Sequence, residues 1–282
     1  MEYYIILLVI FSSLMHSTWH SLVKISDNKL VSYSIINVFA AGVAALYLIY
    51  NPYIVDKSYL YLFFSVLLHL AYKVFLIKAY EATNFSLVFP ISRGSAPVFI
   101  VIITTFFFLE EISYIKISLI LLIGCLISFL SFPSLKRGEA GKKEILLAFC
   151  TGFITALYSL VDGYGGRISE NPIAFICWMY IFDATIFPLY TIVKYEKETK
   201  ILFVKYWRQA FFAALFSVIS YGIIVFSMTK INISEVAAIR EINIVFGTAI
   251  AYLFLKEKVN PYKWVVIVLI TICVSLLSYL RY

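Results

Sequence analysis

Charged residues are scarce in this chain of 282 residues, and long polar stretches are absent. Lysine, arginine, aspartate and glutamate make up 14% of the sequence, hydrophobic residues make up 62%, and the mean hydropathy is +0.93. Soluble domains are about 45–50% apolar and about 25% charged. The composition therefore excludes a soluble domain and predicts an all-α integral membrane protein.

Cysteine and histidine are also sparse, which excludes two kinds of site. The three histidines have no carboxylate at matching spacing, so the HxxxH pattern of His16 and His20 predicts no zinc site. Each cysteine stands alone within an apolar run, which argues against a disulfide framework or a metal cluster. We therefore expect neither a metal nor a cofactor. The cysteines are Cys125, Cys150, Cys177 and Cys273.

The connections between the apolar runs are short, and no soluble domain fits in any of them. A helix needs roughly 20 apolar residues to cross the hydrocarbon core, and ten stretches of the chain meet that need. The first lacks the basic n-region and cleavage site of a signal peptide, so we expect it to remain as a span. The predicted spans are Tyr3–Leu22, Val31–Tyr50, Tyr59–Ala79, Leu87–Leu109, Ile115–Phe132, Ile145–Val161, Pro172–Val193, Gln209–Met228, Val236–Leu255 and Tyr262–Leu280.

Part of the sequence occurs twice. Residues 72–131 align with residues 219–278 at a constant offset and without a gap. Apolar identities are expected between any two hydrophobic segments, but polar identities such as Arg93 with Arg240 indicate a duplication. The other polar identities are Glu110 with Glu257, Lys116 with Lys263, Ser128 with Ser275 and Ser131 with Ser278.

The duplication predicts the architecture. We expect one membrane domain built from two five-helix repeats, residues 1–135 and residues 144–282. Because five is odd, the second repeat enters the membrane upside down relative to the first. Inverted repeats of this kind are typical of secondary transporters, in which a site near the midplane opens to one side and then to the other.

The net charge of +7 predicts contact with a membrane surface rather than with nucleic acid, because the basic residues are scattered over short loops. We expect a lipid bilayer and a small molecule as partners, and a monomer or homodimer. The positive-inside rule places the most basic loops in the cytoplasm and both termini outside. These loops carry Lys136, Arg137, Lys142 and Lys143 after the fifth span, and Lys194, Lys197, Lys200, Lys205 and Arg208 after the seventh.

Some charged residues fall well inside the predicted spans. Each costs roughly 2.5–3.5 kcal/mol at a helix centre. Together, unpaired, they would offset the whole stability of a typical protein, so they must pair or face a hydrated cavity. They are Lys73, Arg93, Asp183, Arg240 and Glu241.

Arg93 and Arg240 are the first candidates for binding a substrate, because the duplication places them at matching depths on helices of opposite orientation. The alternative is that each arginine pairs with a carboxylate such as Glu241 or Glu235. Asp183 and Glu241 are candidates for proton coupling, since a carboxylate at membrane depth alternates between neutral and charged forms. The alternative for Asp183 is a structural pair with a lysine or arginine.

Histidine and aromatic residues add candidates for the wall of a cavity. His69 and Lys73 share one face of the third span at i and i+4, as do His16 and His20 on the first. Aromatic rings near them are suited to stack on a substrate or to surround an ammonium group. The alternative for each ring is packing in the core or against lipid. The candidate aromatic residues are Trp19, Tyr72, Tyr158, Trp178 and Tyr221.

The features of an enzyme are weak. His16, His20 and Asp183 supply groups for acid–base chemistry, but no serine or cysteine stands in a recognisable nucleophile setting. The glycine-rich segment 163–166 predicts a flexible turn after the sixth span and lacks the spacing of a phosphate-binding loop. A membrane-embedded enzyme stays as one alternative, and a passive channel or scaffold stays as another.

Each half has an exit motif after its fourth span, residues 108–111 (Phe-Leu-Glu-Glu) and residues 255–258 (Leu-Lys-Glu-Lys). With ten spans in two halves, these motifs resemble the EamA-type drug/metabolite transporters. The resemblance implies a multi-pass carrier of the inner (plasma) membrane that moves small metabolites, often exporting amino acids or related compounds, through a central cavity. It also implies cytoplasmic termini, opposite to the positive-inside count, so the orientation stays open. The Trp-Gly common in the family's first helix stands here as Trp19-His20, which predicts a narrower and more polar cavity.

Overall fold

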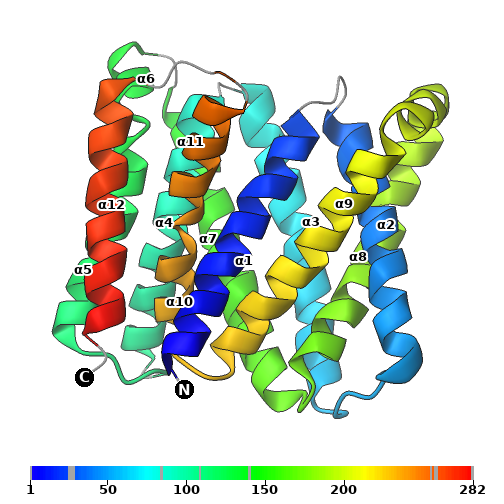
Figure 1. Cartoon of the computed structure of the whole chain (residues 1–282), viewed down its shortest axis with the longest axis horizontal. Coiled ribbons are helices and arrows are strands. Elements are labelled where there is room, and N and C mark those ends of the chain that lie inside the picture. Colours follow the sequence, from blue (N-terminus) through cyan, green and yellow to red (C-terminus); the bar gives the residue numbers. More distant parts are fainter. Residues whose placement is uncertain are drawn as a thin grey trace.

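The computed structural model describes residues 2–24, 29–82, 85–107, 109–138, 141–254, 256 and 260–280. Across these ranges the chain is helical apart from short turns, and none of the described residues lies in a strand. The all-α prediction is confirmed. The helices stand side by side across the molecule, and both ends of the chain lie at the same edge, the lower one in Figure 1.

The helices account for the ten predicted spans. Within the described part of the chain, nine segments are long and apolar enough to cross a bilayer, with α10 and α11 counted as one, and α5 is a shorter apolar helix. In the first half these are α1 (Glu2–Lys24), α2 (Lys29–Tyr50), α3 (Ser58–Ala82), α4 (Phe85–Phe106) and α5 (Tyr114–Phe129), followed by the short α6 (Phe132–Lys136). In the second half they are α7 (Lys142–Ile168), α8 (Pro172–Lys194), α9 (Glu196–Met228), α10 (Ile233–Arg240), α11 (Asn243–Leu253) and α12 (Pro261–Tyr279).

The glycine-rich segment 163–166 is helical, so the prediction of a flexible turn is wrong. It lies inside α7, which continues to Ile168. A Cβ atom at Gly165 would lie 2.5 Å from Cζ of Phe175, and one at Gly163 would lie 2.6 Å from Cδ1 of Ile233. In a membrane, small residues let helix backbones approach closely and need not mark a turn. These glycines let α7 pack against its neighbours.

The start of the eighth span also differs from the prediction. α9 begins at Glu196 rather than near Gln209, so four of the five basic residues assigned to a loop before it lie on α9, and Lys194 ends α8. Residues 196–209 contain neither glycine nor proline, so nothing in this segment ends a helix. Lys200 pairs with Glu196 one turn earlier, with Nζ and Oε1 2.6 Å apart. The helix therefore extends past the apolar span.

The packing between the two halves is reciprocal. α1 of the first half packs along α9, and α7 of the second half packs along α3. α2 packs against α8, and α5 packs against α12. One hydrophobic cluster centres on α5, α10 and α12, and a second centres on α2, α8 and α9. Large apolar side chains such as Leu46 and Val204 are exposed on the outside, as expected for a surface that faces lipid.

Candidate functional site

Polar and aromatic side chains gather between the two hydrophobic clusters. We call this group the central polar cluster. It draws on both halves of the chain, and ion pairs, hydrogen bonds, ring contacts or electrostatic interactions join its members. The cluster consists of His16, Trp19 and His20 of α1; Tyr33 of α2; His69, Tyr72 and Lys73 of α3; Arg93 of α4; Tyr158 and Asp162 of α7; Tyr180 and Asp183 of α8; Tyr221 of α9; and Arg240 and Glu241 at the end of α10.

An ion pair within the cluster joins the two halves. Arg93 Nη2 lies 3.2 Å from Glu241 Oε1, and the two side chains are 12% and 2% exposed. Arg240, the sequence neighbour of Glu241, interacts with the Tyr158 hydroxyl of α7 instead. The two duplicated arginines therefore lie in one cluster but have different protein partners.

The helix that carries Arg240 is broken next to it. α10 ends at Arg240 and α11 begins at Asn243, and Figure 1 shows the two segments stacked in the lower and upper parts of one span. The break weakens the helical pairing of main-chain carbonyls, and two serines of α1 compensate. The Ser13 hydroxyl is shared between the carbonyls of Val9 and Arg240, at 2.8 Å and 3.1 Å. The Ser17 hydroxyl is shared between the carbonyls of Ser13 and Asn243, at 3.0 Å and 2.7 Å. Backbone groups freed at membrane depth need such partners.

A second buried ion pair joins α3 to α8. Lys73 Nζ lies 2.5 Å from Asp183 Oδ2, and both side chains are 7% exposed. The ammonium group also lies 5.9 Å from the ring centroid of Tyr33. The prediction that charges at membrane depth must pair or face a cavity is confirmed for both ion pairs of the cluster.

Asp162 is fully buried and has no lysine or arginine within ion-pair distance in the described structure. Its Oδ2 accepts a hydrogen bond from the Tyr221 hydroxyl, and His69 Nε2 lies 3.8 Å from the same oxygen. The His69 ring packs on Tyr158, with ring centroids 4.3 Å apart. The contacts bring α3, α7 and α9 together around one carboxyl group.

The histidines and Trp19 of α1 form one wall of the cluster. Trp19 Nε1 donates to His16 Nδ1 at 3.3 Å, and the Trp19 and His20 rings stack with centroids 3.8 Å apart. His20 lies within electrostatic reach of Arg93 and Arg240. Its side chain is exposed.

Several buried polar atoms of the cluster have no hydrogen-bond partner. They include donors on both arginines, Arg93 Nε and Arg240 Nε. They also include the carboxylate oxygens Asp162 Oδ1, Asp183 Oδ1 and Glu241 Oε2. Leaving such an atom unsatisfied costs about 1–3 kcal/mol, and more when it is charged. The cluster thus holds both donors and acceptors in place for a polar molecule.

Nearly all of the predicted site residues fall in the central polar cluster, and Trp178 lies apart from it. Its indole Nε1 donates to the carbonyl of Pro52 at 2.9 Å, in the connection between α2 and α3. Sequence reasoning missed Asp162, Tyr33 and Tyr180. Asp162 follows Tyr158 by four residues, so the two share a helix face, and this spacing was the available signal. Ending the sixth span at Val161 hid it.

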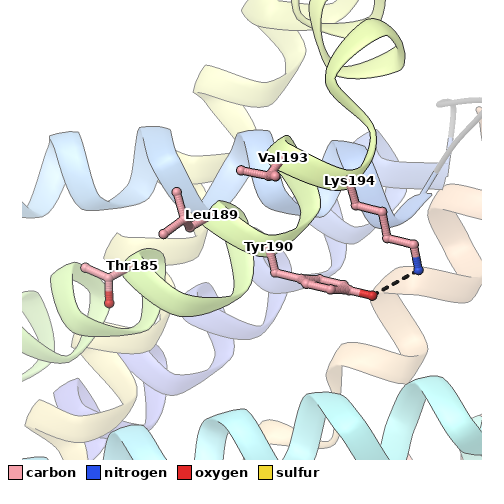
Figure 2. A pocket seen from close by; sticks show the side chains of 5 residues that line it. All are labelled: Thr185, Leu189, Tyr190, Val193 and Lys194. Atoms are coloured by element: carbon pink, nitrogen blue, oxygen red, sulfur yellow. Dashed lines mark hydrogen bonds between the residues drawn. The ribbon is translucent and has the colours of Figure 1, made fainter.

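A hollow on the surface of the described structure lies away from this cluster. It is a shallow groove of about 550 Å³ lined by α8 residues with largely apolar surface. Figure 2 shows its labelled side chains on one helix, with Lys194 Nζ donating to the Tyr190 hydroxyl at 2.9 Å. The groove has few groups that bind a polar molecule. Leu189 and Val193, which line it, are as exposed as the residues on the lipid-facing surface. We therefore place the functional site in the central polar cluster.

The exit motif of the first half has a structural role. Glu110 accepts hydrogen bonds from the main-chain N–H of Ile233 and from the Ser234 hydroxyl, at the start of α10. It also pairs with Arg167, whose Nη2 lies 3.3 Å away. Arg167 in turn donates to the carbonyls of Met228 and Ile231. We call these contacts the Glu110 network. In the second exit motif, Leu255, Glu257 and Lys258 lie outside the described residues.

Comparison with known proteins finds a family match in the second half of the chain. Residues 142–279 match the EamA-like transporter family. The second half of the chain is therefore similar to this family. An EamA-like transporter is a multi-pass membrane protein of the drug/metabolite transporter type, with a small-molecule substrate and a bilayer around it. No curated protein matches at a significant level.

The fold of the chain also occurs among solved structures. One, titled "Crystal structure of protein", aligns over 100% of both chains with a TM-score of 0.71 and 13% sequence identity. At that identity the likeness concerns the fold alone. The ten-span arrangement is therefore shared over the full length of both chains.

Proposed function

We propose that the protein is a secondary transporter that moves a small polar metabolite, an amino acid or a related organic anion or zwitterion, by alternating access. The observation that carries this proposal is the pair Arg93 and Arg240. They come from the two halves of the chain, lie in one buried cluster, and each keeps a donor nitrogen without a partner. The resemblance implies export across the inner (plasma) membrane, and we adopt that direction.

The chemistry of the cluster favours a substrate with an anionic group. A guanidinium group is planar and always charged, and it binds carboxylate or phosphonate oxygens through two parallel hydrogen bonds. Asp162 and Glu241 each have a carboxylate oxygen without a hydrogen-bond partner. In the same cluster, these oxygens supply acceptors for an ammonium group. The aromatic rings of Tyr72, Tyr158 and Trp19 add a surface for apolar atoms.

Alternating access is supported by the helix arrangement. We propose that residues 1–135 and 144–282 are inverted repeats, and the reciprocal packing of α1 on α9 and of α7 on α3 favours this. A broken helix beside the site also supports it, because discontinuous helices line the midplane sites of many transporters. The break between α10 and α11 lies beside Arg240.

Asp183 and Glu241 are the candidates for proton coupling that the sequence proposes. Each has a cation in contact, Lys73 for Asp183 and Arg93 for Glu241. Uptake of a proton by either one would release its cation for another partner. Asp183→Asn and Glu241→Gln each test this, since coupling through either residue requires that its variant changes the dependence of transport on the pH gradient.

Counterflow in reconstituted liposomes tests the transporter proposal. Ligands are first found by thermal stabilisation of the purified protein with amino acids, organic acids, amines and phosphonates. We expect an unlabelled ligand inside the vesicles to drive accumulation of the labelled ligand from outside, with saturation. A flux that never saturates and shows no counterflow would indicate a passive channel. Chemical conversion of the ligand would indicate an enzyme.

A further inference from the structure

Asp162 differs from the other carboxylates of the central polar cluster in the side chains that surround it. α3 contributes His69, α9 contributes Tyr221, and α10 contributes Arg240. Tyr158 lies one turn earlier on the same helix, and Tyr180 of α8 is within electrostatic reach. α4, which also packs against α7, contributes Arg93, but that group is paired with Glu241.

The hydrogen bonds of His69 limit its protonation states. Its Nδ1 lies 3.0 Å from the main-chain carbonyl of Ser65, and a carbonyl only accepts, so Nδ1 carries a hydrogen. Nε2 faces Asp162 Oδ2 at 3.8 Å. If both groups were deprotonated there, a lone pair would face a carboxylate in a region of low dielectric, which is repulsive. One extra proton on the pair removes this repulsion.

The pair can hold that proton in two ways. Either His69 is a cation beside the Asp162 carboxylate, or His69 is neutral beside a protonated Asp162. Both states have no net charge, and loss of the proton leaves one negative charge. Asp183 and Glu241 differ, because each has a lysine or arginine at 2.5 Å and 3.2 Å that balances the carboxylate without a proton.

We infer that Asp162 and His69 together bind one transported proton, and that the cationic group of the substrate displaces it. This inference rests on the proposed function. The proton leaves the pair for the open side of the membrane, and the substrate's ammonium group then balances the negative charge at Asp162. Tyr221 and His69 both face Oδ2, so Oδ1 is the oxygen that neither of them occupies and that the ammonium group is proposed to contact. The protein is then an antiporter that moves the substrate against a proton.

The proton itself is detected without any substrate. In infrared difference spectra between acidic and alkaline pH, a protonated carboxyl group gives its own C=O stretch and a protonated imidazole gives its own ring bands, so the proton is detected on either member of the pair. We expect wild type and Asp56→Asn, the matched change at an exposed aspartate outside the cluster, to show the pH-dependent band of the pair and Asp162→Asn to lack it. Persistence of the full band in Asp162→Asn, or its loss in Asp56→Asn alone, would overturn the assignment.

Tyr221→Phe gives a second readout in case Asp162→Asn does not fold. The Tyr221 hydroxyl donates to the charged carboxylate, and a hydrogen bond to the charged form favours deprotonation. Its removal is expected to move the titration midpoint of the band upward by about 1–2 pH units. A midpoint that stays in place, or that moves downward, would contradict the role of Asp162.

A last measurement separates this inference from the proposed function. Stabilising ligands are added to weakly buffered protein with a pH indicator, comparing an amino acid with the same acid lacking its amino group. We expect release of about one proton per protein with the amino acid in wild type and none in Asp162→Asn. Counterflow without proton release would leave a transporter and overturn the antiport site. A titrating Asp162 without counterflow would instead refute the transporter proposal.

Discussion

The central polar cluster and the Glu110 network both place charged groups among the helices, but they differ in how completely those groups are bonded. In the Glu110 network, each carboxylate oxygen has partners and Arg167 donates to two carbonyls as well. In the central cluster, Arg93 and Arg240 keep nitrogens without a partner. A network with every atom bonded stabilises the fold. A cluster with free atoms is suited to bind something else.

The central polar cluster and the Glu110 network lie at opposite ends of α10, in keeping with the difference in how completely their charged groups are bonded. The Glu110 network lies where α9 ends and α10 begins, at the lower edge of Figure 1, and it holds the first turn of α10. The central cluster begins where α10 ends, beside the break. One short helix of eight residues therefore connects a fixed end to a site that is open to a ligand.

The largest expected effect on stability comes from the fully bonded region. Glu110→Ala leaves Arg167 without its carboxylate and the first N–H groups of α10 without an acceptor. We expect a loss of about 2–4 kcal/mol in the free energy of unfolding, since buried charged and polar groups lose their partners. Thermal or denaturant unfolding in detergent measures it. Glu111→Ala, whose side chain is exposed, serves as the control and should change little. Equal stability of the two variants would remove the distinction.

The second prediction concerns the arginines of the open cluster. Arg93→Lys and Arg240→Lys keep the charge but lose the planar fork, so the affinity for the stabilising ligand should fall. Loss of a charge-assisted hydrogen bond costs about 1.5–3 kcal/mol, which is roughly tenfold to hundredfold in Kd. The protein should remain folded in detergent. Arg208→Lys, on the exposed part of α9, is the matched control for the same change.

The outcome of the arginine variants decides between two roles. Wild-type affinity in both variants would mean that neither arginine holds the substrate. Failure of both to fold would mean that the arginines are structural, as Glu110 and Arg167 are. Either result would remove the proposed difference in role between the central polar cluster and the Glu110 network.

The third prediction concerns the break between α10 and α11. Ser13→Ala and Ser17→Ala each remove a hydroxyl that bonds a carbonyl of the broken segment. We expect about 0.5–1.5 kcal/mol of lost stability for each, the usual net value of a hydrogen bond. Thr18→Ala is the control, because its hydroxyl makes the same kind of bond within α1, to Leu14, and the carbonyls across the break are bonded by Ser13 and Ser17. Melting curves of the three variants and wild type compare them directly. No difference from Thr18→Ala would show that the break needs no support from α1.

The smallest effect on transport is expected for Trp178. Trp178→Phe loses the hydrogen bond to Pro52, which lies in the connection between α2 and α3, so the transport rate should stay near wild type. Trp19→Phe, within the cluster, should lower it. Counterflow of the same ligand measures both. A larger defect in Trp178→Phe than in Trp19→Phe would move the site away from the central cluster.

The positions of the site residues illustrate what could be predicted from the sequence. The depth of Arg93, Arg240, Lys73 and Asp183 follows from their places within long apolar runs, and the demand for partners follows from the cost of burial. The identity of each partner does not follow, because it depends on how each helix is rotated. Asp162 was missed for a related reason. Glycine after it indicated a turn, and only close contact with other helices explains glycine inside a span.

Composition, span length and the internal repeat determined by themselves that this is an all-α membrane protein of ten spans, because a bilayer requires long apolar helices whatever lies between them. Tertiary structure alone decided that Glu241 pairs with Arg93 across the two halves, that Glu110 caps α10, and that His69 meets Asp162. The physical reason is that hydrophobicity adds along the chain, residue by residue. An ion pair requires two side chains from distant segments within about 4 Å, which only the packing of the helices provides.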